Sequence, residues 1–163
     1  MNASLAATFD DMALVWRPLR VEDVAGVAAL ERESHLAPWT SGNFVDALAA
    51  GYSMMVGVAA GAIVAYGVLL LAPGEAQLLN LTVAPRARRQ GLGRTLLRRF
   101  LADARLRGAE QCFLEVRVSN SAAIALYAAE GFVPVARRVA YYPPTSTGER
   151  EDALVMRRAL RAS

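Results

Sequence analysis

A long stretch without any charged residue, from Ala47 to Gly74, limits most strongly how this chain can fold. Such a stretch is either a helix that crosses a membrane or a set of strands in a sheet that is packed on both faces. The segment is long enough to cross a bilayer, but no Lys or Arg flanks it as an interfacial anchor. Ala60-Gly61 falls between two β-branched runs, as the turn of a hairpin does. We therefore predict two strands, about 53–59 and 62–72, in a covered sheet.

The rest of the chain predicts one mixed α/β domain. At 163 residues it is most simply a single domain, which buries roughly 70% of its unfolded surface. Residues 1–12 predict a loose tail that lacks the basic start and apolar block of a secretory signal, so the domain spans 13–163. Periodicity and turn residues predict the order β-α-α-β-β-β-α-β-α-β-β. The other strands are expected near 13–19, 76–84, 111–118, 132–142 and 151–160, and the helices near 21–35, 41–50, 92–107 and 121–130.

Polar and glycine residues mark the expected helix ends. Ser41 is expected to cap the second helix and Asn120 the fourth, because their side-chain oxygens accept hydrogen bonds from free N–H groups. Gly108 is expected to end the third helix, where a left-handed residue is favoured. Each position gives one expected end of its helix.

The loop "RRQGLG", from Arg88 to Gly93, stands between a strand and a helix. Strand, helix and strand follow one another from 76 to 116, so the two strands should be parallel neighbours with a right-handed connection. Glycines at a helix start let an anion approach free N–H groups and the positive end of the helix dipole. No Gly-Lys-Ser/Thr follows, and Leu96 replaces the third glycine of a dinucleotide fingerprint. The loop therefore predicts either an anion site of another kind or a helix start with a solvated arginine face.

Composition excludes several classes of site. With Cys112 and His35 as its only cysteine and histidine, the chain can form no internal disulfide and no zinc cluster, which fits a reducing cytoplasm and predicts no metal. Cys112 lies in an apolar strand pattern and is expected to be an inert core thiol. The net charge of +3 favours an anionic ligand. Residues 86–107 contain Phe100 as their only aromatic residue, so no base-stacking surface for nucleic acid is expected.

Two motifs stand in register along the chain. Arg88, Gly91 and Gly93 fit the pattern Arg/Gln-x-x-Gly-x-Gly/Ala after a strand that ends "LTVAP". The later "NSAAIALYAAEGF" fits Asn-x-x-Ala-x-x-Leu-Tyr-x-x-x-Gly-Phe. Together they resemble the GCN5-related N-acetyltransferases, the GNAT family, over about 15–160. The resemblance implies the GNAT fold, in which the central strands splay around acetyl-CoA. It is greatest to the branch that acetylates the N-terminal alanine of ribosomal protein S18, through "APW", "YYP" and "REDALVM".

The resemblance also implies where acetyl-CoA binds. Its pyrophosphate would be held by the backbone amides of 89–94, and its pantetheine arm would lie along 81–83 as an extra strand does. A backbone N–H in 81–83 would stabilise the oxyanion of the tetrahedral intermediate. The expected cofactor-binding residues are Leu81, Thr82, Val83, Arg88, Arg89, Gln90, Gly91, Leu92, Gly93, Arg94 and Asn120.

Two residues are candidates for the chemistry. A protein α-amino group has a pKa near 8, so about a tenth is neutral at pH 7, and a carboxylate acting through a water can remove the proton. Glu115, a lone acid in "CFLEV" near the carboxyl end of its strand, is the candidate base, or else it forms an ion pair with Arg117. Tyr127 occupies the position of the family's acid, and a phenol can protonate the leaving thiolate. Its alternative is a core tyrosine packed beside Ile124.

The family resemblance points to an acceptor pocket between the first two helices and the 141–149 loop. Trp39, Tyr141 and Tyr142 are its expected walls, and Glu31 or Glu33 would meet a positive side chain. Each of these residues has the alternative of a packing or surface role. The sequence therefore predicts a candidate pocket without fixing its lining.

Four functions follow, in decreasing order of support. The first is a cytoplasmic N-α-acetyltransferase for the N-terminal alanine of ribosomal protein S18, without nucleic acid or membrane as a direct partner. The second is a GNAT acetyltransferase for another protein N-terminus, a lysine or a small amine. A non-catalytic acetyl-CoA sensor and an RNA-binding module are the others, and a lack of salt-dependent RNA affinity would dismiss the last.

Overall fold

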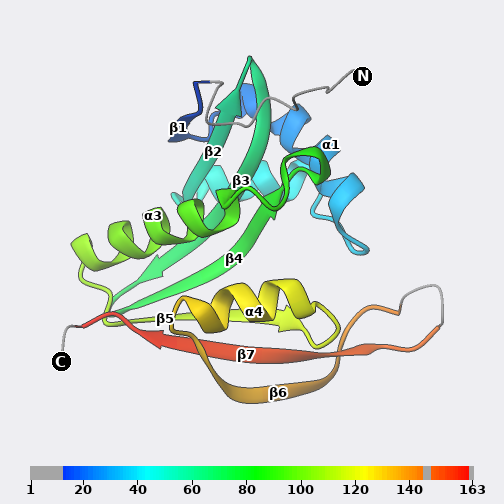
Figure 1. The fold of residues 1–163 in the computed structure, drawn as a ribbon, viewed down its shortest axis with the longest axis vertical. Coiled ribbons are helices and arrows are strands. Elements are labelled where there is room, and N and C mark those ends of the chain that lie inside the picture. The colour runs from blue at the N-terminus through cyan, green and yellow to red at the C-terminus, as the bar shows by residue number, and fades with distance from the viewer. Residues whose placement is uncertain (1–12, 145–147, 162–163) are drawn as a thin grey trace, which may run out of the picture.

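The computed structural model describes residues 13–144 and 148–161, which form a seven-stranded sheet with helices on both faces (Figure 1). The predicted order of strands and α-helices is confirmed, and the predicted tail at 1–12 lies outside the described residues. The strands are β1 (Val15–Pro18), β2 (Ser53–Ala59), β3 (Ala62–Ala72), β4 (Glu75–Val83), β5 (Gln111–Arg117), β6 (Val133–Tyr142) and β7 (Glu151–Ala159). The helices are α1 (Val24–Ser34), α2 (Ser41–Ala49), α3 (Leu92–Leu106) and α4 (Ser121–Ala129), and short 3-10 turns cover Val21–Asp23 and Pro85–Ala87.

The sheet has the order β1-β2-β3-β4-β5-β7-β6. Among the described strands only β4 and β5 pair in parallel, as the strand–helix–strand pattern predicts, and α3 connects them. The uncharged stretch forms the β2–β3 hairpin, so its reading as a membrane-spanning helix is wrong. Ala60 and Gly61 both have a positive φ, of 49° and 76°, which is what a tight two-residue hairpin turn requires. Among the described residues, no helix has the length and apolar character needed to cross a bilayer.

Each face of the sheet carries its own core. Helices α1 and α2 pack on one face against β2 and β3, with Val27, Phe44 and Val56 fully buried. Helices α3 and α4 cover the other face, where Leu96 and Phe100 pack against β3, β4 and β5. Because both faces of the central strands are covered, the sequence there needs no polar alternation, which accounts for the long uncharged stretch.

The helix ends follow the sequence with one correction. Asn120 caps α4 as predicted, because its side-chain oxygen accepts a hydrogen bond from Ala123 N at 3.2 Å. Ser41 does not cap α2 and is instead its first residue. Thr40 is the cap, since it is extended and its hydroxyl accepts from Asn43 N at 3.1 Å, while Asn43 Oδ1 accepts from Thr40 N. Gly108 lies beyond the last turn of α3 with a φ of 85°, so it ends that helix as expected.

The two parallel strands separate halfway along their length (Figure 1). Their last paired residues are Leu78 of β4 and Leu114 of β5, although both strands continue beyond them. At the same level β4 carries a bulge: Leu78 pairs with Leu69 of β3 and Asn80 with Val68, so Leu79 is an extra residue. A bulge reverses which residues face each side of a sheet. Residues of β4 beyond it therefore have the opposite alternation to those before it.

Candidate active site

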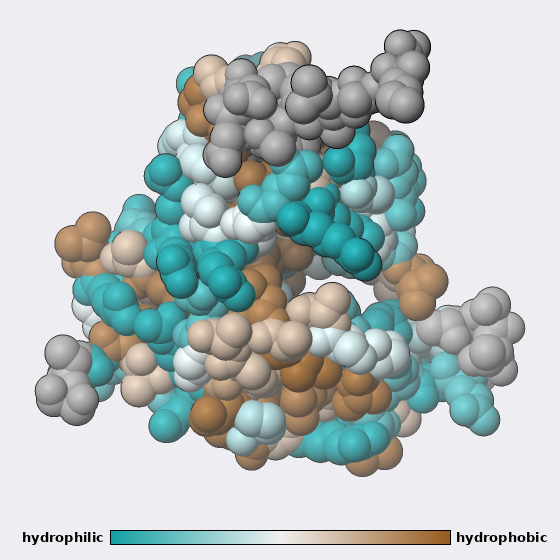
Figure 2. All heavy atoms as spheres, in the orientation of Figure 1, coloured by the Kyte–Doolittle hydropathy of each residue, from teal (hydrophilic) through white to brown (hydrophobic). Residues whose placement is uncertain are grey.

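A cavity of about 220 Å³ lies where β4 and β5 separate. In Figure 2 a notch divides the mainly hydrophobic surface over α4 from the more polar half of the molecule above it. Its lining comes from five parts of the fold and thus joins both faces of the sheet through the gap. The main contributors are Glu31, His35 and Trp39 near the end of α1, 78–81 of β4, 114–117 of β5, Asn120 and Tyr127 of α4, and Tyr142.

Glu115 lines this cavity from the face of β5 that α4 does not cover. Its neighbours Leu114 and Val116 are buried under α4, so alternation along the strand turns Glu115 the other way. The predicted alternative of an ion pair with Arg117 is wrong. Glu115 Oε1 instead lies 3.0 Å from Arg138 Nε on β6, and Arg117 pairs with Glu151 at 3.4 Å. The sheet places β7 beside β5 and β6 beyond β7, which local spacing along one strand does not reveal.

Tyr127 reaches the same cavity from α4, on the other face of the sheet. Its ring is buried and lies edge-on to Phe132, with the ring centroids 5.8 Å apart. Burial raises the pKa of its phenol above the ordinary range, so the hydroxyl is protonated at neutral pH. Among the described residues no hydrogen-bond partner holds that hydroxyl. Tyr127 therefore packs as a core residue and also presents a proton donor to the cavity.

The predicted aromatic walls are partly brought together. Trp39 and Tyr142 line the cavity, whereas Tyr141 does not. Tyr141 instead forms a hydrogen bond to the cavity residue Glu115, which raises the pKa of the Tyr141 phenol. Consecutive residues of a regular strand point to opposite faces, yet the rings of Tyr141 and Tyr142 lie 5.2 Å apart. Ala140, with a φ of 50°, interrupts β6 just before them and allows this arrangement. The neighbouring loop at 145–147 lies outside the described residues.

An arginine side chain lies over the ring of each of the two tyrosines, Tyr141 and Tyr142. The guanidinium of Arg117 lies 4.3 Å from the ring centroid of Tyr142, and that of Arg138 lies 5.3 Å from the ring of Tyr141. Burial, followed by the charge of Glu115, raises the pKa of Tyr142 to about 12. This side of the cavity is thus a stacked wall of two phenols and two guanidiniums around one carboxylate.

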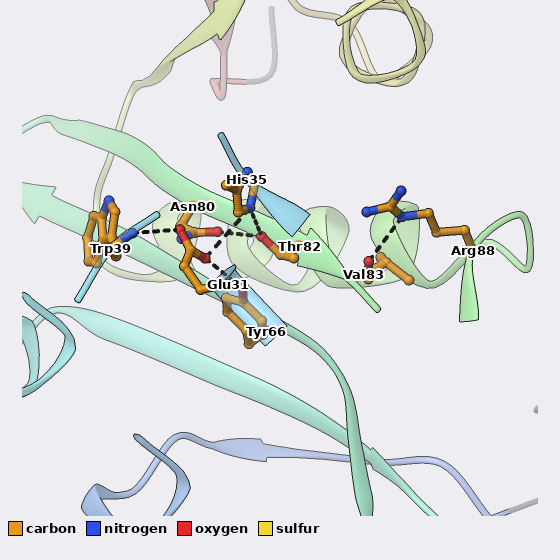
Figure 3. Close-up of polar contacts among 8 residues, drawn as sticks. All are labelled: Glu31, His35, Trp39, Tyr66, Asn80, Thr82, Val83 and Arg88. Carbon is orange, nitrogen blue, oxygen red and sulfur yellow. Dashed lines mark hydrogen bonds and ion pairs between the residues drawn. The ribbon is translucent and has the colours of Figure 1, made fainter. Parts of the chain in front are cut away.

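The glycine loop has the geometry of an anion site. Arg89 and Gly91 are left-handed, with φ of 63° and 77°, and Gly91 begins α3 without any side-chain cap. The first intrahelical hydrogen bond runs from Thr95 N to the Gly91 carbonyl, which leaves the N–H groups of Leu92 and Gly93 ahead of it. Two of the three predicted arginine side chains have partners elsewhere: Arg88 Nε donates to the Val83 carbonyl at 3.2 Å (Figure 3), and Arg94 pairs with Glu130 at 3.0 Å.

The edge of β4 beyond the bulge is open toward β5, because β4–β5 pairing stops at Leu78. Leu81 lines the cavity at this edge, and Asn120 faces it from the start of α4. The capping bond uses the Asn120 oxygen and leaves its amide nitrogen as a donor. Thr82 does not line the cavity with its side chain, which is buried toward α1. A contact of Thr82 with acetyl-CoA could therefore involve only its backbone.

A buried polar network lies beside the cavity and was not predicted (Figure 3). The carboxylate of Glu31, only 2% exposed, accepts hydrogen bonds from Tyr66 Oη at 2.6 Å, Asn80 Nδ2 at 3.0 Å and Trp39 N at 3.1 Å. The expectation that Glu31 meets a positive side chain of a substrate is wrong, because its oxygens are occupied inside the protein. Glu33 is exposed and its role stays a prediction. The sequence signals were an acid on the apolar face of a helix and two polar residues in "LLNLTV".

Two other sequence expectations concern reactive groups. Cys112 is fully buried, and burial raises the pKa of its thiol to about 12, so it behaves as a core residue. Across 13–144 and 148–161, no group of three or more His, Cys, Asp or Glu side chains is placed to hold a metal ion. The side chains around the cavity offer a carboxylate at Glu115, a phenol at Tyr127 and an imidazole at His35.

Comparison with known proteins gives the family. Residues 19–132 match the acetyltransferase (GNAT) family. The chain is 36% identical over 138 residues to the [ribosomal protein bS18]-alanine N-acetyltransferase of Escherichia coli K12, covering 85% of this chain and 92% of that protein. It is 34% identical over 142 residues to a putative enzyme of the same name from Bacillus subtilis, covering 86% and 91%.

Solved structures agree with these sequence matches. The crystal structure of the S18-alanine N-acetyltransferase from Escherichia coli superimposes with a TM-score of 0.85 at 34% identity, over 92% of this chain and 96% of that one. Ard1 from Thermoplasma volcanium gives a TM-score of 0.83 at 30% identity, over 92% and 99%. From its sequence and its splayed sheet alike, the chain belongs to the GNAT family of acetyltransferases.

Proposed function

We propose that this protein transfers the acetyl group of acetyl-CoA to the N-terminal alanine of ribosomal protein S18. The observation that carries the proposal is that Glu115 and Tyr127 reach one cavity from opposite faces of the splayed sheet. Relatives from Escherichia coli and Bacillus subtilis that carry this activity in their names match over more than 80% of the chain. Because the proposed substrate is a ribosomal protein, we expect the reaction to occur in the cytoplasm.

The donor side of the site would use backbone groups. The free N–H groups at the start of α3 would bind the pyrophosphate of coenzyme A, where the helix dipole favours an anion. The open edge of β4 at 81–83 would bond the pantetheine arm as a neighbouring strand does, with the Asn120 amide as a further donor. This arrangement would place the thioester in the gap between β4 and β5. An N–H of the same β4 segment would then stabilise the oxyanion.

The acceptor side would use Glu115. Its carboxylate would take a proton from the α-ammonium through a water, so that the neutral amine attacks the thioester carbonyl. The C–S bond then breaks as the C–N bond is completed, and the leaving thiolate takes the proton of Tyr127. Burial raises the pKa of Tyr127, so its hydroxyl is still protonated at neutral pH when the thiolate forms beside it.

The test uses acetyl-CoA and peptides with the N-terminal sequence of S18, each with a free or a blocked α-amino group, followed by mass spectrometry. Acetylation of the free N-terminus alone supports the proposal. Acetylation of lysines or small amines at equal rates would instead identify a broader acetyltransferase. Binding of acetyl-CoA without any turnover would identify a sensor. The absence of acetyl-CoA binding would exclude the S18 acetyltransferase, the broader acetyltransferase and the sensor alike.

A further inference from the structure

We propose that His35 binds the amino end of the acceptor peptide through Nδ1, and that the buried Glu31 network is the positioning device that leaves this nitrogen available. The proposal rests on the function proposed above and assigns a residue to its acceptor side. His35 lies just beyond α1 and lines the cavity on the same face of the sheet as Glu115. Its side chain is 38% exposed, whereas that of Glu31 beside it is 2% exposed.

The direction of the network follows from the chemistry of its members. Asn80 Nδ2 donates to Glu31, so Asn80 Oδ1 is left as an acceptor, and it accepts the Thr82 hydroxyl hydrogen at 2.7 Å. A hydroxyl has a single hydrogen, so Thr82 Oγ1 can only accept from His35 Nε2, which lies 2.7 Å away (Figure 3). The proton of neutral His35 therefore resides on Nε2, and the ring's lone pair is on Nδ1.

Every other contact of Glu31 strengthens this assignment. Its carboxylate accepts only, and its partners Tyr66, Asn80 and the Trp39 backbone are all donors. Its Oε2 also lies 3.6 Å from His35 Nε2, which favours a proton on that nitrogen. The hydrogen bonds thus all run from donors toward the carboxylate of Glu31. If any bond in the chain from His35 through Thr82 and Asn80 to Glu31 ran the other way, two lone pairs or two hydrogens would face each other.

Nδ1 is the ring nitrogen that the network does not use, and no described residue forms a hydrogen bond or ion pair with it. A neutral ring with its lone pair at a cavity wall accepts hydrogen bonds from ammonium or amide N–H groups. Those are the groups at the amino end of a peptide acceptor. The bulge at Leu79 makes this possible, because it turns Asn80 and Thr82 toward α1 and so toward His35.

Four variants test the proposal. H35Q keeps an amide N–H for Thr82 but has no counterpart of Nδ1, so the KM for the peptide should rise roughly 10- to 100-fold with the acetyl-CoA Kd unchanged. E31Q places an amide N–H among groups that are themselves hydrogen-bond donors, so it should also raise the peptide KM. Y66F removes one donor to Glu31 from a residue outside the cavity lining and should have a smaller effect. V27A, at a fully buried position on the same helix, is the control for lost stability and should leave KM unchanged.

The direct readout is nitrogen NMR on protein labelled with ¹⁵N-histidine, which reports on one residue because the chain contains one histidine. In alkaline buffer the wild type should show a protonated Nε2 and an unprotonated Nδ1, and E31Q should show a mixture of tautomers. Added S18 peptide should shift the Nδ1 signal. A shift with the free amine alone assigns the ammonium as the donor, and a shift with the N-acetylated product as well assigns an amide.

Failure of this inference differs from failure of the proposed function. If the wild type acetylates the peptide but the ring is protonated on Nδ1, or H35Q retains the wild-type KM, the role of His35 is refuted and the function stands. If the wild type neither acetylates nor binds the peptide, both are refuted. A fall in thermal stability of H35Q with an unchanged peptide KM would reduce the network to a structural role.

Discussion

Replacing Tyr127 by Phe removes one hydroxyl from the cavity and tests the assignment of the acid. The Phe ring keeps the edge-on contact with Phe132, and no described residue loses a hydrogen bond. The free energy of unfolding should therefore change by less than about 1 kcal/mol. Loss of a positioned acid costs about 10²- to 10⁴-fold in rate, which corresponds to roughly 2.7–5.4 kcal/mol in the activation barrier.

The assay measures kcat for peptide acetylation and the melting temperature of the same preparation. Tyr52→Phe is the matched control, because Tyr52 packs partly buried against the other core but does not line the cavity. The pH dependence adds a second readout. Because burial raises the pKa of Tyr127, deprotonation of the acid should lower kcat only above about pH 10, the ordinary tyrosine value. A Y127F enzyme with wild-type kcat and wild-type stability would refute the reasoning.

Three further predictions follow from other parts of the structure. Glu115→Gln should lower kcat about 10²- to 10⁴-fold with an unchanged acetyl-CoA Kd, and it should cost less than about 1 kcal/mol in stability because the partner Arg138 is largely exposed. Gly91→Ala and Gly51→Ala place a Cβ in open space at φ of 77° and 78°, so both should lose about 1–2 kcal/mol of stability, but only G91A should weaken acetyl-CoA binding in calorimetry. Arg98 lowers the pKa of Glu130, so this pair stabilises the fold above about pH 4.3 and less as the pH falls further. The difference in melting temperature between wild type and Glu130→Gln should accordingly shrink from pH 7 to pH 3, and a constant difference would contradict the ion pair's role.

The elements could be predicted because each depends on residues close together in the sequence. The hairpin turn at Ala60-Gly61, the glycine start of α3 and the Asn120 cap are all read within a few positions. The one wrong cap is equally local: Thr40 and Ser41 are both good caps, and the choice depends on which of them is extended. Sequence alone does not settle that backbone angle.

The polar partners could not be predicted, because they depend on register across the sheet. Glu115 pairs with Arg138 on β6 although Arg117 is nearer in sequence, because β7 lies beside β5 and β6 lies beside β7. The Glu31 network joins α1 to β3 and β4 and exists only after a bulge that no spacing rule places. An acid at helical spacing with Val27 was nevertheless a visible signal, since a carboxylate on a buried face requires donors from elsewhere in the fold.

The extra residue at Leu79 links the two halves of the proposed site. By ending the β4–β5 pairing it opens the gap through which Tyr127 on one face and Glu115 on the other approach the same space. By reversing the alternation of β4 it also turns Asn80 toward the buried carboxylate of Glu31 on α1, which thereby gains a third hydrogen-bond donor. A regular β4 would lose both features together. The donor cleft and the acceptor wall are therefore consequences of one local irregularity, so a substitution that removed the bulge would affect binding of both substrates at once.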